Sequence, residues 1–184
     1  YAFGIVGSPM KNLIPADNIL SNNKVEYAVD EVMGINRNEH ILTTKSGEMF
    51  KYRKLILATG SNPVIPPIPG TEKKNIFAIN KDVPYLQNMI EKLEKANDLC
   101  IVGCGFIGVE IAEECRRRRP DLNISIVEML SHCLQLVYDE EFCINAEKVL
   151  KEQNINLLLD EKVDAFLGCE TVERVKLNSG KEIK

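Results

Sequence analysis

The sequence predicts an α/β protein in which a parallel sheet with helices is combined with antiparallel β-meanders. Two observations favour this fold class. Strand-like and helix-like segments alternate from about residue 80 to residue 159, and short hairpin patterns precede and follow this stretch. Alternation at this spacing is typical of βαβ units, whose strands run parallel. We therefore expect a parallel sheet that carries helices, with one meander before it and another after it.

Residues 25–60 predict the first meander and a buried strand behind it. Turn-forming residues at Asn36 to Asn38 and at Ser46-Gly47 separate the strand-like runs. These runs are 25–35, 40–45 and 48–52. The segment Leu55 to Ala58 is continuously apolar and is bounded by turn signals, which is typical of a strand buried on both faces. Residues 1–22 carry no pattern that assigns them a role.

A proline-rich connector, SNPVIPPIPG over residues 61–70, is the best candidate for a domain boundary. Its four prolines restrict the backbone, so the segment is stiff and extended. The strand–turn–strand pattern of residues 41–52 resembles that of residues 175–184, which suggests two similar nucleotide-binding halves. We therefore expect part of one domain over residues 1–66, and a second domain over residues 67–184 that is truncated at its C-terminal end.

Strands and helices alternate after the connector. A helix capped by Asn80 or Asp82 comes first, because Leu86, Met89, Ile90 and Leu93 recur at helical spacing. The later strands are expected at 99–102, 123–128, 155–159, 163–167 and 171–177, and the later helices at 106–118 and about 140–153. The last helix carries the apolar residues Phe142, Ala146, Val149 and Leu150.

The motif G-x-G-x-x-G, formed by Gly103, Gly105 and Gly108, lies between an expected strand and an expected helix. The first glycine permits a tight turn, the second lets the backbone approach a pyrophosphate, and the third permits close packing of the helix on the strand. The phosphates would bind at the helix N-terminus that begins at Phe106. The pattern predicts a Rossmann-like dinucleotide-binding domain.

Glu128 is the expected partner of this motif. It ends the next strand, ISIVE, about 20 residues after the last glycine, where an acidic side chain can bind both ribose hydroxyls of an adenosine. A carboxylate here, with no Arg or Lys in the residues that follow, disfavours the 2′-phosphate of NADP. The sequence therefore predicts a preference for NAD(H).

The six cysteines are interpreted as structural residues. None forms a C-x-x-C pair and the chain has two histidines, so no metal site is expected. Cys100 and Cys104 lie in a strand and a turn from which their side chains diverge. We expect all six to be reduced and mostly buried. Cys133, beside His132, is the one whose neighbours hint at a reactive thiol.

Several segments together resemble one known enzyme family. These are KLILATGSNP (54–63), PPIPG (66–70), GCGFIGVE (103–110) and IVEM (126–129). In this order they resemble the FAD- and NAD(P)-dependent pyridine nucleotide-disulfide oxidoreductases, in the branch that contains NADH oxidases, coenzyme A-disulfide reductases and nitrite reductase-like enzymes. The resemblance covers about residues 25–184.

The resemblance implies the central, NAD(H)-binding portion of a flavoprotein that passes hydride from NADH to FAD. Residues 1–66 would end the flavin-binding domain, with Ala58, Thr59 and Gly60 near the junction of the two nucleotides. Phe106 would take the position of an aromatic gate over the flavin, and Glu110 that of a carboxylate near the nicotinamide amide. The expected NAD-binding residues are Gly103, Gly105, Phe106, Ile107, Gly108, Glu110 and Glu128.

The same resemblance implies which functions lie outside this stretch. No FAD-binding glycine motif occurs in residues 1–59, and the family's redox cysteine and its dimer-forming domain have no counterpart. We therefore expect no catalytic residue here, no activity of this chain alone, and a homo-oligomeric parent enzyme. Two alternatives remain open: a Rossmann dehydrogenase without flavin, and a non-catalytic NAD-sensing module.

Overall fold

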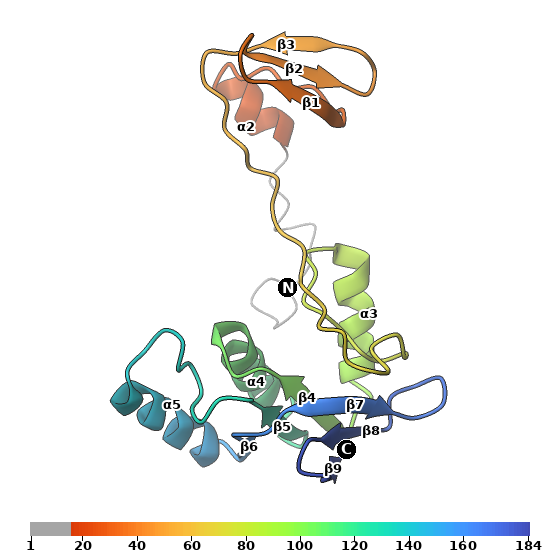
Figure 1. The fold of residues 1–184 in the computed structure, drawn as a ribbon, viewed down its shortest axis with the longest axis vertical. Helices are drawn as coiled ribbons and strands as arrows, with labels where there is room; N and C mark the ends of the chain where they lie inside the picture. Colours follow the sequence, from red (N-terminus) through yellow and green to blue (C-terminus); the bar gives the residue numbers. More distant parts are fainter. Residues whose placement is uncertain (1–15) are drawn as a thin grey trace. The chain divides into compact units, whose positions relative to one another are not determined.

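The computed structural model describes residues 16–184 of the chain. They belong to two compact units, residues 16–61 and residues 62–184 (Figure 1). Within the described residues, no helix is long and apolar enough to cross a membrane.

The described part of the first unit contains one helix and a three-stranded antiparallel sheet. Helix α2 (Ala16–Asn22) is followed by strands β1 (Val32–Asn36), β2 (Ile41–Thr44) and β3 (Met49–Lys51) in that spatial order. The β2–β3 turn contains Gly47 at φ +91°, a conformation that glycine adopts easily. The predicted meander is confirmed, although its first strand begins at Val32 rather than near residue 25.

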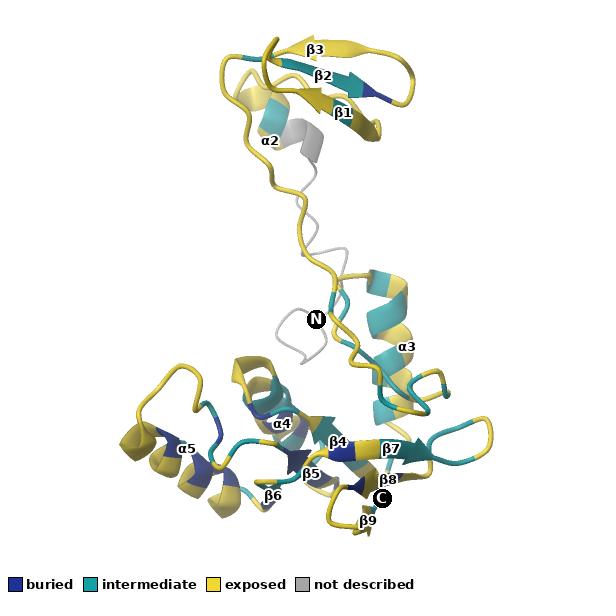
Figure 2. Cartoon of the chain, viewed as in Figure 1, coloured by how far each residue is buried: buried dark blue, intermediate teal, exposed yellow. Residues whose placement is uncertain are grey.

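The strand predicted over Leu55 to Ala58 is wrong. Residues 55–60 form neither a strand nor a helix, and the segment is exposed (Figure 2). Ile56 and Leu57 are 87% and 68% exposed. A buried strand needs a partner at its edges and cover on its faces. The described residues supply neither for this segment, so its apolar composition alone does not produce a strand.

The second unit carries the predicted alternation of helices and strands. Helix α3 (Val83–Leu93) begins at the N-cap Asp82, whose carboxylate accepts a hydrogen bond from the Tyr85 N–H at 2.8 Å. The next elements are β4 (Asp98–Val102), α4 (Phe106–Arg118), β5 (Asn123–Val127), α5 (Glu140–Glu152) and β6 (Ile155–Leu158). The last elements are β7 (Val163–Leu167), β8 (Arg174–Leu177) and β9 (Glu182–Ile183). Most expected boundaries agree within a few residues.

The strands of this unit form a parallel sheet and an antiparallel sheet. Strands β4, β5 and β6 pair in parallel in that order, whereas β7, β8 and β9 form an antiparallel meander. The predicted α/β fold with parallel βαβ units and a second meander is confirmed.

The two faces of the parallel sheet pack against different partners. Ile124 and Ile126 of β5 join Ala112 of α4 and Leu150 of α5 in one apolar cluster. Val127 of the same strand packs instead with residues of β7 and β8. Because neighbouring side chains of a strand point to opposite faces, helices cover one face of this sheet and the meander contributes to covering the other.

The connector is joined to β7 by backbone contacts. The Phe166 N–H donates to the Pro69 carbonyl at 2.8 Å, and a Cβ atom on Gly70 would lie 2.3 Å from the Phe166 carbonyl oxygen. Lys74 forms a parallel bridge with Thr171. The first residues of this unit are therefore attached to its last sheet.

The residues that helix α5 buries agree only in part with the apolar set noted in the sequence, since Leu150 is the member common to both. Its buried residues are Cys143, Glu147 and Leu150, whereas Phe142 and Val149 are exposed. The helix therefore turns a stripe that contains a carboxylate toward the core. Hydrogen bonds to that carboxylate, described below, explain why it is buried.

Candidate functional site

The glycine turn joins β4 to α4 and has a backbone that requires glycine at two positions. Gly103 has φ +103°, a left-handed conformation that other residues rarely adopt. Its N–H donates to the Val127 carbonyl at 2.8 Å, which ties the turn to β5. A Cβ atom on Gly108 would lie 2.0 Å from the Gly103 carbonyl oxygen. Glycine at this position therefore permits the close packing of α4 on the turn.

The N-terminus of α4 presents open backbone beside this turn. Gly105 is the N-cap, and a Cβ atom there would have nothing within 4 Å. The N–H groups in the first turn of a helix have no carbonyl partner within it, and the helix dipole is positive at this end. Accessible N–H groups at a positive helix end are the usual binding site of a pyrophosphate, so the geometry suits a dinucleotide.

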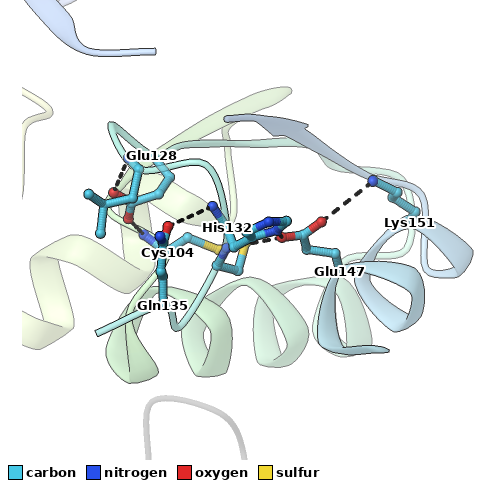
Figure 3. The surroundings of a disulfide bond; sticks show 8 residues. Cys104, Glu128, His132, Gln135, Glu147 and Lys151 are labelled. Carbon is cyan, nitrogen blue, oxygen red and sulfur yellow. Dashed lines mark hydrogen bonds and ion pairs between the residues drawn. A yellow bond between two sulfur atoms is a disulfide. The ribbon is translucent and has the colours of Figure 1, made fainter. Parts of the chain in front are cut away.

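Glu128 follows β5 directly, and its carboxylate faces the glycine turn. Glu128 Oε2 accepts a hydrogen bond from the Cys104 N–H at 2.7 Å, and Oε1 accepts one from the Leu130 N–H at 3.0 Å (Figure 3). The structure thus brings Glu128 to the glycine turn, 24 residues earlier in the chain. The sequence did not predict these two bonds to backbone N–H groups.

A disulfide bond lies next to this carboxylate and contradicts the expectation that all six cysteines are reduced. Cys104 and Cys133 are bonded to each other, with Cα atoms 4.8 Å apart, and both are completely buried (Figure 3). Local sequence does not reveal such a pair because its members are 29 residues apart. Cys133 is therefore not a free thiol in this structure.

The other four cysteines are free, and burial raises the pKa of three of them, Cys100, Cys115 and Cys143. Burial raises the pKa of Cys100 to about 12 and that of Cys115 to about 11. Such thiols are poor nucleophiles at neutral pH. Cys169 is the exposed member of a set that was predicted to be mostly buried.

The buried carboxylate of Glu147 fixes the loop that contains Cys133. Glu147 Oε1 accepts a hydrogen bond from the Cys133 N–H at 3.1 Å and lies 3.0 Å from His132 Nδ1. Glu147 Oε2 lies 3.9 Å from Lys151 Nζ (Figure 3). These contacts attach the loop of residues 128–135 to α5.

A row of aromatic side chains lies on the surface at the start of α4. The ring of Phe106 meets that of Tyr138 edge to face, with centroids 5.7 Å apart, and Tyr138 stacks on Phe142 at 5.8 Å. All three side chains are exposed. Phe106 was predicted from the sequence as a site residue, whereas its neighbours Tyr138 and Phe142 were not.

The remaining predicted site residues are exposed. Ile107 and Glu110 lie on the first turns of α4, close to the glycine turn along the helix. Ala58, Thr59 and Gly60 lie in the other compact unit, and Gly60 has φ +73°. Their roles at a nucleotide junction stay predictions.

Comparison with known proteins identifies the family. Residues 8–184 match the family described as pyridine nucleotide-disulphide oxidoreductase. The chain belongs to this family. Its relatives include several proteins named NADH oxidase. The family resemblance drawn from the sequence is confirmed.

Relatives of this oxidoreductase chain are enzymes of greater length. It is 34% identical over 152 residues to an NADH oxidase of Enterococcus faecalis, a match that covers 80% of the chain and 33% of that enzyme. It is 25% identical over 163 residues to a nitrite reductase [NAD(P)H] of Bacillus subtilis, covering 89% and 20%. The chain therefore spans about a third of the NADH oxidase.

Solved structures with the same fold also come from this group of oxidoreductases. Reduced CoADR-RHD of Bacillus anthracis superimposes with a TM-score of 0.83 and 28% identity, over 100% of this chain and 34% of that one. The water-forming NADH oxidase of Lactobacillus brevis bound to NADH has a TM-score of 0.78, 21% identity, and coverage of 100% and 41%.

Proposed function

We propose that residues 67–184 bind NAD(H) as the central portion of an FAD-dependent NADH oxidoreductase. The observation that carries this proposal is the joint geometry of the glycine turn, the open N-terminus of α4 and the Glu128 carboxylate. Membership in the pyridine nucleotide-disulphide oxidoreductase family supports the same reading.

The pyrophosphate of NAD(H) would bind the free N–H groups at the start of α4. Gly105 leaves room for this approach because no side chain covers the backbone there. Glu128 would bind the adenosine ribose. A carboxylate offers about four lone-pair sites, and two are occupied by the Cys104 and Leu130 N–H groups. The others remain for the two ribose hydroxyls, so the same side chain orders the turn and binds the sugar.

Hydride would leave the nicotinamide end of the dinucleotide. By family resemblance, Glu110 would approach the nicotinamide amide and Phe106 would lie beside the reacting rings. When bound, FAD supplies the hydride acceptor. The described residues 16–61 contain no second glycine turn of this type, so they do not fit the pyrophosphate of FAD. We place Ala58, Thr59 and Gly60 near its junction with NAD(H).

We further propose that the parent enzyme works in the cytoplasm as a homo-oligomer. The matches cover 33% of the NADH oxidase and 20% of the nitrite reductase, and an additional domain would supply the oligomer contact and the electron acceptor.

Calorimetric titration of the chain with NADH and NADPH tests the proposal. We expect at least a tenfold preference for NADH, about 1.4 kcal/mol, because Glu128 repels a 2′-phosphate. The Glu128→Ala substitution should weaken NADH binding and reduce the preference, whereas Glu141→Ala, at an exposed position of α5, should change neither.

The absence of NADH binding would contradict the proposal, and equal affinities for the two cofactors would remove Glu128 from its role. We also expect the purified chain to retain no FAD. Stoichiometric flavin that resists dialysis would show that residues 16–61 hold more of the flavin site than we infer.

A further inference from the structure

We propose that the Cys104–Cys133 pair is a thiol–disulfide switch that sets the affinity of the glycine turn for NAD(H). This inference rests on the proposed function, because it concerns the same dinucleotide site. The pair adds a redox-sensitive covalent bond to a turn whose shape decides how the pyrophosphate is held.

Cys104 lies at the centre of the proposed pyrophosphate site, between Gly103 and Gly105. Its N–H donates to Glu128 Oε2 at 2.7 Å, and its carbonyl accepts a hydrogen bond from the Leu134 N–H at 2.9 Å. Its side chain forms the disulfide. All three groups of this residue therefore connect the turn to the 128–135 loop.

The 128–135 loop is itself held firmly at its far end. The Cys133 N–H and the His132 ring both contact Glu147 Oε1, on the buried face of α5. Gln135 Oε1 accepts hydrogen bonds from the His132 N–H and the Ser131 hydroxyl, each at 3.1 Å. The disulfide thus attaches the glycine turn to an anchored support rather than to a free loop.

Opening the disulfide would remove the covalent restraint on the turn, which would then be held by hydrogen bonds such as those from Gly103 to Val127 and from Cys104 to Glu128. Cβ atoms on Gly103 and Gly105 would meet nothing within 4 Å, so no packed side chains restrain these two positions, and glycine populates many backbone conformations. A site held in its binding conformation before the ligand arrives loses less entropy on binding. The closed pair therefore favours NAD(H) binding, and we expect reduction to weaken it about tenfold.

The redox step needs a small-molecule dithiol as the reductant. A thiolate of the reductant attacks one sulfur, the Cys104–Cys133 bond breaks, and a mixed disulfide forms. The second thiol of the reductant then displaces the protein sulfur. The protein gains two electrons and two protons, and the reductant becomes a disulfide. A small-molecule disulfide reverses the exchange.

Access to the pair depends on opening of the loop, because both cysteines are completely buried. A ligand that holds the turn and Glu128 together opposes this opening. If NAD(H) binds the disulfide form ten times more tightly than the reduced form, then by linkage bound NAD(H) lowers the equilibrium constant for reduction of the disulfide tenfold. For a two-electron couple this equals a shift of about 30 mV. Bound cofactor and disulfide thus protect each other.

The experiment begins with a count of thiols in the purified chain. Alkylation after denaturation without reductant should label four cysteines, and prior treatment with dithiothreitol should raise the count to six. Fluorescence titration of NADH against the two forms then measures affinity. We expect about tenfold weaker binding by the reduced form, and slower reduction of the disulfide when NADH is present.

Two variants separate this pair from the other cysteines. Cys133→Ser should bind NADH like the reduced wild-type chain and should not respond to dithiothreitol. Cys169→Ser removes the exposed thiol and should keep the full response. Six labels without reductant, or equal or tighter NADH binding after reduction, would overturn the switch alone. Failure of both forms to bind NADH would overturn the dinucleotide site, and the switch with it.

Discussion

Two apolar segments of similar composition differ in secondary structure and in burial. Residues 55–58 (LILA) form neither a strand nor a helix, with Ile56 87% exposed, whereas residues 124–127 (ISIV) form most of β5, with Ile126 0% exposed. The segments differ in what surrounds them. Strand β5 pairs on both edges and is packed on both faces. An apolar run is thus a necessary condition for a central strand, and its neighbours determine whether one forms.

Truncation of one isoleucine in each segment should give the largest difference in stability. Ile126→Ala should lower the free energy of unfolding of the second unit by about 2–5 kcal/mol, because it leaves a cavity in a packed core. Ile56→Ala should change stability by no more than about 0.5 kcal/mol. Urea unfolding followed by circular dichroism measures both. A comparable loss for Ile56→Ala would show that residues 55–58 are packed in solution.

The glycine turn allows a sharper comparison inside the second unit, because two of its glycines differ in their surroundings. Gly108→Ala places a Cβ atom against the Gly103 carbonyl and should cost about 1–3 kcal/mol of stability. Gly105→Ala adds a Cβ atom in open space and should leave stability nearly unchanged.

The Gly105→Ala variant should nevertheless weaken NADH binding, since the new methyl group covers the proposed phosphate site. Thermal unfolding and NADH titration of both variants separate the two effects. Unchanged NADH affinity in Gly105→Ala would place the pyrophosphate away from this backbone.

The buried carboxylate of α5 should be costly to remove. Glu147→Ala leaves the Cys133 N–H without its acceptor and removes the partner of the His132 ring, which should cost about 1–3 kcal/mol. Glu141→Ala, at an exposed position of the same helix, is the matched control and should cost well under 1 kcal/mol. Chemical denaturation measures the free energy of unfolding of both variants. Equal losses of stability would mean that the buried contacts of Glu147 do not stabilise the fold.

Acid should produce the smallest effect, and it should act in both units. Hydrogen bonds from Ser46, the largest contribution, lower the pKa of Asp30 from 3.8 to about 2, and the Arg119 guanidinium does the same for Asp121. Because these folded-state pKa values lie below the ordinary value, each carboxylate stabilises its unit above about pH 4. That contribution is lost as the pH falls toward about 2.

Comparison of the wild-type chain with Asp30→Asn and Asp121→Asn between pH 5 and pH 2 measures this loss. Each variant should have a flatter stability profile than the wild-type chain. Identical profiles would show that the two hydrogen-bonded carboxylates do not contribute.

Local patterns in the sequence were enough to predict the order and approximate bounds of the helices and strands in the second unit. The glycine motif marked both the turn and the start of α4, because glycine geometry and the helical period are local properties. The disulfide and the burial of Glu147 were not predictable in this way. Each depends on a partner that only the folded chain brings close: Cys133 for Cys104, and the His132–Cys133 backbone and ring for Glu147.

The attachment of the connector to β7 has a mechanical consequence. The Phe166–Pro69 hydrogen bond and the Lys74–Thr171 bridge join the first residues of the second unit to its final sheet. A stretching force applied through residues 62–67 would therefore act first on β7. This strand lies on the side of the parallel sheet away from α4. Insertions or deletions before Ile68 should alter the length of the connector without straining the turn at Gly103.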